Sequence, residues 1–174
     1  MKNIWKNFKT FFNSERGSFM IEAAVGLSLI TIGMLGILTL VSRSMKINHT
    51  VEYKVVAANL AAEGVEVVRN LIDINCAQEK AWNDGLSDGI YKVSFETTGD
   101  LSDSDWNTPI KYSSSTGEYG YDLGDDTIYK RKIGIFNKSG YEIVASSTVE
   151  WTFEKKINKI SIEDHFFNWR GDNL

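Results

Sequence analysis

The sequence predicts an α+β protein in which a long N-terminal helix packs on an antiparallel β-meander of about four strands. Three observations predict it: an uncharged apolar stretch at residues 23–41, an amphipathic helical pattern that continues to about residue 72, and alternating apolar and polar residues in the last hundred positions. Of the 174 residues, 43% are apolar and 24% are charged, which excludes a disordered chain.

The apolar stretch is long enough to cross a membrane. Residues 23–41 read AAVGLSLITIGMLGILTLV, nineteen residues without a charge. A helix of that length spans roughly 28 Å. A secretory signal peptide has an apolar core of about 7 to 15 residues before a small-x-small cleavage site, whereas SRSMKIN follows the run here. We therefore expect a membrane-spanning helix at residues 23–41.

The charges divide the chain into a basic end and an acidic body. Residues 1–17 carry four basic residues and one acidic residue, so their net charge is +3 and the remainder is −7, for a total of −4. Three basic residues also follow the apolar run, so charge alone hardly orients it in the membrane. An acidic body has no basic stripe for phosphate contact, and we predict no nucleic-acid partner.

A short motif precedes the apolar run. The sequence at residues 16–22 is RGSFMIE, in which a basic stretch ends in Gly17, Ser18 follows, and Glu22 comes four residues later. This combination resembles the class III leader and mature N-terminus of type IV prepilins. The resemblance implies that a prepilin peptidase, a membrane aspartyl peptidase, cleaves after Gly17 and methylates the new amine of Ser18. It also implies that Glu22 and the neighbouring Phe19 serve filament assembly.

Ser18 and Glu22 each leave an alternative open. The first mature residue in the family is often phenylalanine, and minor pilins and pseudopilins tolerate the change to a residue such as Ser18. A carboxylate in the first helical turn gains about 0.3 to 1 kcal/mol from the helix dipole, which is one explanation of Glu22. An acidic residue inside a membrane segment costs roughly 2.5 to 3.5 kcal/mol at the centre and usually has a partner. The amine freed at Ser18 would be such a partner.

The helical pattern continues after the apolar run without a proline. Apolar residues recur at three- and four-residue steps and are expected to face a sheet: Ile47, Val51, Val55, Ala58, Ala62, Val65, Val68 and Ile72. A single helix over residues 18–72 would be about 80 Å long. A dimeric coiled coil is the alternative, but the stripe is short and rich in alanine. The expected domains are a cleaved leader at 1–17, the long helix at 18–74 and a β-rich globular domain at 75–174.

The last hundred residues predict strands and turns. Residues 90–96 alternate as in a half-buried strand, and residues 99–126, which contain Pro109, give the least regular pattern. Residues 127–136 and 141–153 flank the loop NKSG at 137–140, which predicts a hairpin. A turn at 154–158 leads to a strand containing Ile160 and Ile162. Asp164 is then expected to cap a short closing segment at 165–169.

A second resemblance involves the globular part. The stretch AAEGVEVVRN at 61–70, the strand residues VEW at 149–151 and the ending FFNW at 166–169 are similar to bacterial minor pilins of the PilV-like group. This resemblance implies the type IV pilin architecture. Many major pilins close their C-terminal region with a disulfide, and the single cysteine, Cys76, excludes that device within this chain.

The sequence contains no recognisable catalytic or metal-binding pattern. No Ser/His/Asp or Cys/His arrangement and no phosphate-binding glycine loop is present, so we predict that the protein is not an enzyme and needs no cofactor. The two histidines lie far apart in sequence, and no metal site is predicted. Two acidic groups do not match the EF-hand spacing and are interpreted as solvated loops rather than calcium ligands: Asp100, Asp103 and Asp105, and then Asp122, Asp125 and Asp126. The late aromatic residues are interpreted as core packing rather than a ligand platform: Trp151, Phe153, Phe166, Phe167 and Trp169.

These observations together predict a structural, minor pilin-like subunit of a type IV pilus or related filament. The expected partners are the prepilin peptidase, the membrane before assembly, and other pilin subunits through the N-terminal helix. The expected location is the inner or cytoplasmic membrane, with one span and an extracytoplasmic C-terminal domain, and then the pilus or cell surface. The alternatives are a type II secretion pseudopilin and an uncleaved, membrane-anchored extracytoplasmic binding domain.

Overall fold

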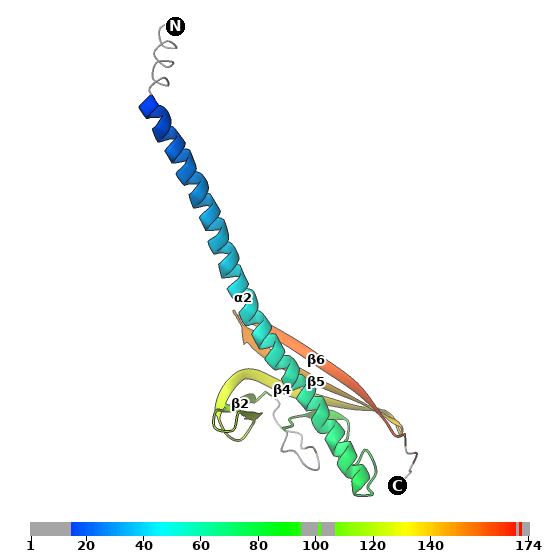
Figure 1. The fold of residues 1–174 in the computed structure, drawn as a ribbon. Helices are drawn as coiled ribbons and strands as arrows, with labels where there is room; N and C mark the ends of the chain where they lie inside the picture. The colour runs from blue at the N-terminus through cyan, green and yellow to red at the C-terminus, as the bar shows by residue number, and fades with distance from the viewer. Residues whose placement is uncertain (1–14, 95–100, 102–106, 170, 172–174) are drawn as a thin grey trace. The chain divides into compact units, whose positions relative to one another are not determined.

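The computed structural model describes residues 15–94, 101, 107–169 and 171. The chain divides into two compact units, Met1–Val51 and Glu52–Leu174. The helix α2 (Glu15–Ala77) is 63 residues long and contributes to both units (Figure 1). The strands all belong to the second unit, so the α+β prediction is confirmed.

The C-terminal end of α2 is fixed by a buried asparagine. The side-chain amide of Asn75 donates to the backbone carbonyls of Trp82 at 3.3 Å and Asp84 at 2.8 Å. Glu79, just after the helix, has a φ of 58°, which ends the helical path. Cys76 in this last turn is half-buried and not in a disulfide. The chain thus turns back at once and returns to the sheet.

The described residues form a six-stranded antiparallel sheet. Its strands are β1 (Gly89–Tyr91), β2 (Pro109–Ser113), β3 (Glu118–Gly120), β4 (Asp125–Ser139), β5 (Glu142–Phe153) and β6 (Lys156–Phe167). The order is β3-β2-β4-β5-β6, and β1 also pairs with β4. The fifteen-residue β4 is long enough to pair with both short strands, β2 near its start and β1 near its end.

The predicted strand number was wrong, and the reason lies in short strands. Residues 99–126 were expected to be the least regular part, yet they contain β2 and β3, of five and three residues. Strands so short leave little alternating pattern in a sequence rich in turn residues. The predicted meander applies to β4, β5 and β6 alone, because β1, β2 and β3 join β4 in a different order.

Three further expectations about strands need adjustment. Asp164 does not cap a closing segment: β6 runs to Phe167, and the Asp164 carboxylate accepts a hydrogen bond from Arg69 Nη2 at 2.9 Å. The turn before β6 is only two residues long, since Glu154 and Lys155 both have positive φ, as a tight hairpin requires. Of the strand expected at 90–96, β1 covers only the beginning, and residues 95–96 lie outside the described residues.

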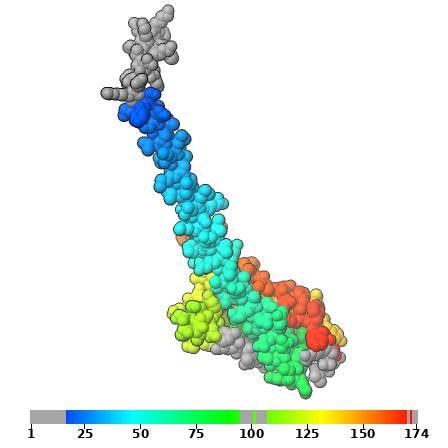
Figure 2. All heavy atoms as spheres, viewed as in Figure 1, coloured from blue at the N-terminus to red at the C-terminus, as the bar shows by residue number. Residues whose placement is uncertain are grey.

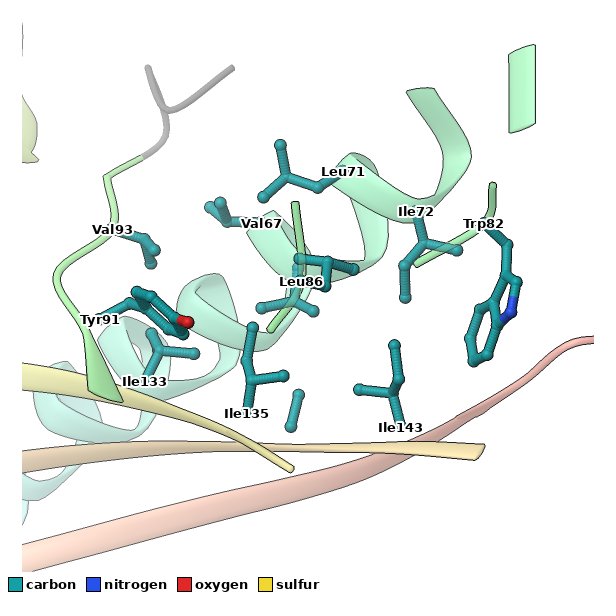
Figure 3. Packing of buried hydrophobic residues seen from close by; sticks show 12 residues of the cluster. Val67, Leu71, Ile72, Trp82, Leu86, Tyr91, Val93, Ile133, Ile135 and Ile143 are labelled. Atoms are coloured by element: carbon teal, nitrogen blue, oxygen red, sulfur yellow. The ribbon is translucent and has the colours of Figure 1, made fainter. Parts of the chain in front are cut away.

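The core lies between the second part of α2 and one face of the sheet. Figure 3 shows Val67, Leu71 and Ile72 of α2 facing Ile133, Ile135 and Ile143 of β4 and β5. The predicted stripe was partly wrong, because Val51, Val55 and Ala62 are exposed. The buried hydrophobic side chains of the helix are those of Ala57, Leu60, Ala61, Val65, Val67, Val68, Leu71 and Ile72. The small residues Ala57, Ala61 and Gly64 lie in the first part of this face, and at Gly64 the helix approaches the sheet closely.

A buried arginine joins the helix to the sheet at this close approach. The Arg131 side chain on β4 is only 1% exposed, and its guanidinium donates to the carbonyls of Leu60 at 2.9 Å and Val93 at 2.6 Å. Its Nη1 also lies 3.1 Å from Oε1 of Glu63. A Cβ added to Gly64 would lie 2.5 Å from Ser147 Oγ, so the helix backbone and β5 leave no space for a side chain there.

Candidate functional site

The predicted processing residues lie at the start of α2. The helix begins at Glu15, so the peptide bond between Gly17 and Ser18 belongs to its first turn. The first four backbone N–H groups of a helix have no acceptor within it. Local unwinding of this turn therefore breaks few hydrogen bonds.

The helix brings Ser18 and Glu22 onto one face. Residues four apart in a helix are neighbours on its surface, with a rise of about 6 Å along the axis. Ser18 and Glu22 are both exposed, and Phe19 between them is 73% exposed. Cleavage before Ser18 would place an amine within reach of the Glu22 carboxylate, either in the same chain or in a neighbouring copy.

The stretch that follows is apolar and exposed on all sides. Residues 18–49 of α2 are exposed, apart from the half-buried Gly26 (blue to cyan in Figure 2). Its large exposed apolar residues run from Phe19 and Met20 to Met45 and Ile47. Among the described residues, α2 is the one helix that is long and apolar enough to cross a membrane. The prediction of one helix with the length and composition of a membrane span is confirmed.

The hydroxyl groups within residues 23–41 are all directed to the helix backbone. Ser28, Thr31 and Thr39 each donate to the carbonyl three or four residues earlier, at distances of 2.7 to 2.8 Å. Because no water is available in hydrocarbon, such a bond removes the cost of an unpaired donor. These hydrogen bonds were not predicted from the sequence, although the position of each hydroxyl within a helix would have indicated them.

Three glycines of the same stretch have open space beside them. A Cβ added to Gly26, Gly33 or Gly36 would meet no atom within 4 Å. The chain itself therefore gives no packing reason for glycine at these positions, and α2 is continuous through all three. Small residues in membrane helices allow a second helix to approach closely. This surface suits a neighbouring helix.

The outer face of the sheet carries a separate charged cluster. His165 Nδ1 lies 2.8 Å from Glu142 Oε1, and His165 Nε2 lies 3.4 Å from Glu163 Oε1. The hydrogen bond between His165 and Glu142 raises the pKa of His165 and lowers the pKa of Glu142. His165 and Glu163 are exposed on β6, whereas Glu142 on β5 is half-buried. Within the described part of the chain, no group of three or more potential ligands is arranged to hold a metal.

The other predicted residues occupy different environments. Trp151 is buried as expected, and Phe153 and Phe166 are half-buried, but Phe167 and Trp169 are exposed. The aromatic residues are thus not one core cluster, because β6 continues to Phe167 and alternates its side chains between the two faces. Asp122, Asp125 and Asp126 are exposed, whereas Asp100, Asp103 and Asp105 lie outside the described residues.

No family model, curated protein or solved structure matches this chain. The candidate site is therefore defined by its own residues. These are the Gly17–Ser18 bond in the first helical turn, Glu22 one turn later, and the exposed apolar surface beyond it.

Proposed function

We propose that this protein is a structural, minor pilin-like subunit of a type IV pilus or related filament. It is cleaved between Gly17 and Ser18 and is assembled from the membrane through its N-terminal helix. One observation carries the proposal: α2 is exposed on all sides over residues 18–49 apart from Gly26, it has no charge at residues 23–41, and Glu22 lies one turn after Ser18 at its start.

Lipid alone accounts for only part of this surface. Hydrocarbon would cover the apolar side chains and accommodate the hydroxyls, which already bond to the helix backbone. It would not favour Glu22, whose charge is costly near an apolar phase without a partner. A bundle of such helices covers the same apolar surface, offers Glu22 the amine of Ser18 in a neighbouring copy, and uses the open space at Gly33 and Gly36.

The partners and location follow from this role. A prepilin peptidase removes residues 1–17, the helix holds the chain in the inner or cytoplasmic membrane, and the globular unit lies outside the cytoplasm until the subunit enters the filament. A minor subunit is preferred because Ser18 replaces the usual first phenylalanine and Cys76 has no cysteine partner in the chain. The same features also suit a type II secretion pseudopilin.

Mass spectrometry of the N-terminus of the mature chain tests this proposal. We expect a chain that begins at Ser18 with an N-methylated amine. Gly17→Leu should abolish this shortening, because the peptidase must accept the backbone just before the cut and glycine has no side chain to clash. Recovery of intact residues 1–17 in the surface-exposed pool would overturn the proposal in favour of an uncleaved, membrane-anchored domain.

A further inference from the structure

The strand β6 forms one edge of the sheet. It is twelve residues long and, within the described residues, pairs with β5 alone. Figure 1 shows β6 along one side of the sheet, and its surface is visible in orange to red in Figure 2. Its pairing with β5 continues over all twelve residues without a bulge, and it contains no proline. Such an edge presents unpaired backbone groups to another strand.

The charges along β6 are divided between its two halves. Lys156 and Lys159 lie in the first half, and Glu163 and Asp164 lie in the second. Lysine on an edge strand normally discourages pairing with other chains. A parallel, in-register copy of β6 would indeed place Lys159 beside another Lys159. An antiparallel copy reverses the order and places the basic half beside the acidic half.

We propose that β6 pairs in antiparallel fashion with β6 of a second copy of this chain, around a twofold axis at Ser161. In this register Ser161 faces Ser161, and Lys159 faces Glu163 of the second copy, once on each side of the axis. Ile160 faces Ile162 in the same way. Directly opposite residues in an antiparallel pair lie on the same face of the sheet, so the combined sheet keeps its inner and outer faces.

Both faces of β6 favour this register. On the outer face, Ile157 is 78% exposed and Phe167 is 58% exposed, and the pairing makes them diagonal neighbours across the new strand pair. On the inner face, Ile160 and Ile162 already pack on the core and would extend it into the second copy. A shift by two residues would place Lys159 opposite Ser161 or His165 and would lose the ion pairs.

The two charged residues at the centre are available in the single chain. In the part of the chain that the structure describes, Lys159 has no ion-pair partner, and the ion pair of Glu163 is the 3.4 Å contact with His165. Lys159 and Glu163 lie on the outer face, where the side chains of β6 are exposed. The pairing therefore satisfies two charges without first breaking a buried interaction.

The twofold axis also determines which copies are joined. The segment 52–77 of α2 lies along the inner face of the sheet, so a half-turn about an axis perpendicular to the sheet reverses its direction. The two copies then present residue 52 at opposite ends of the dimer. This arrangement suits copies from different filaments or opposed membranes. It is independent of Gly17 and Glu22, so it goes beyond the proposed function.

Sedimentation of the full chain in detergent micelles tests the proposal, because each copy then brings its own micelle. We expect a concentration-dependent dimer. Lys159→Glu or Glu163→Lys should each weaken it on the order of tenfold, since two attractive pairs become repulsive. An equimolar mixture of the two variants should restore the dimer, because both of its cross-strand pairs are again Glu–Lys. Lys80→Glu makes the same charge change beyond the helix and should leave the dimer unchanged.

Cross-linking gives a second readout that does not depend on charge. In a Cys76→Ser background, Ser161→Cys should form a disulfide between copies, whereas Thr148→Cys on the neighbouring inner strand should not. A chain that stays monomeric, or a mixture that remains as weak as its folded single variants, would overturn the proposal. Glu22→Ala should still dimerise, so failure here and failure of the filament proposal are distinguishable.

Discussion

The two stretches of α2 obtain their stability in different ways. Residues 18–49 are exposed around the whole helix, while residues 52–77 bury one face against the sheet. Both stretches contain glycine, but a Cβ at Gly33 would meet nothing within 4 Å, and a Cβ at Gly64 would lie 2.5 Å from Ser147 Oγ. One helix therefore carries two kinds of surface: one is buried within the chain, and the other is left exposed by the described residues.

The largest expected difference between the stretches concerns filament entry. Glu22→Ala should lower incorporation into filaments by more than about a hundredfold if it removes the partner of a desolvated amine, by analogy with broken buried ion pairs. Asp73→Ala removes an exposed carboxylate from the second stretch and should have little effect. Sheared filaments and membranes are assayed by immunoblot. Equal incorporation of Glu22→Ala at equal membrane levels would leave only the helix-dipole role for Glu22.

The second prediction tests the interface that the chain completes by itself. Arg131→Ala should reduce the free energy of unfolding by about 3 kcal/mol, because it removes the ion-pair partner of the half-buried Glu63 and the side-chain donor to the Leu60 and Val93 carbonyls. Arg69→Ala is the matched control, since Arg69 pairs with Asp164 at the surface and should contribute less than about 1 kcal/mol. The measurement is urea unfolding followed by tryptophan fluorescence. Equal losses in the two variants would contradict the prediction.

Alanine substitutions at Gly33 and Gly64 should give a smaller difference between the two stretches of α2. Gly64→Ala should cost about 1 to 2 kcal/mol, because overpacking against Ser147 and Ile133 outweighs the gain in helix propensity. Gly33→Ala meets no atom and should leave unfolding of the unit Glu52–Leu174 unchanged. Ser147→Gly should relieve part of the cost at Gly64. Thermal melts compare the variants, and identical melts for both alanine substitutions would mean that the close approach at Gly64 is not limiting.

The sequence predicted most of what local patterns can determine. The long helix and the β4–β5 hairpin follow from periodicity and turn residues, and the proximity of Ser18 and Glu22 follows from helical spacing alone. The strands β2 and β3 within residues 99–126 were not predicted, because they are too short to show an alternating pattern. The buried face of α2 was misplaced because Ala58 and Ala62 fit a helical stripe as well as Ala57 and Ala61 do, and only packing against the sheet distinguishes them.

The burial of Arg131 was not predicted, although the alternation of residues along its strand indicates it. Arg131 lies between Lys130 and Lys132, which makes all three residues look like surface charges. Strand alternation nevertheless gives Arg131 the same parity as Tyr129 and Ile133, both of which are buried. Its acceptors could not have been predicted, because Leu60 and Val93 are distant in sequence. The contact between His165 and Glu142 likewise depends on the register of β5 and β6.

The smallest expected effect is a pH dependence confined to the unit Glu52–Leu174. The pKa of His165 is raised above 6.5, chiefly by the hydrogen bond with Glu142. The stability that this interaction adds to the fold is therefore fully present below pH 6.5 and is lost as the pH rises through the pKa of His165 in the folded state. The pKa of Glu142 is lowered below 4.5, chiefly by the hydrogen bond with His165, with Lys138 adding to it. The stability that Glu142 adds is fully present above pH 4.5 and is lost as the pH falls through the pKa of Glu142 in the folded state.

The pair therefore stabilises the fold most between about pH 4.5 and 6.5. His165→Gln should lower the melting temperature slightly in this window and leave it unchanged well above it, where the wild-type imidazole is neutral. Because His165 is exposed and Glu142 is only half-buried, solvent and salt screen the interaction, and the difference in melting temperature should shrink further in high salt. His49→Gln lies in the other unit and should not alter the pH profile of this transition. If the difference in melting temperature between His165→Gln and the wild type grew above pH 8, packing rather than charge would explain how His165 stabilises the fold.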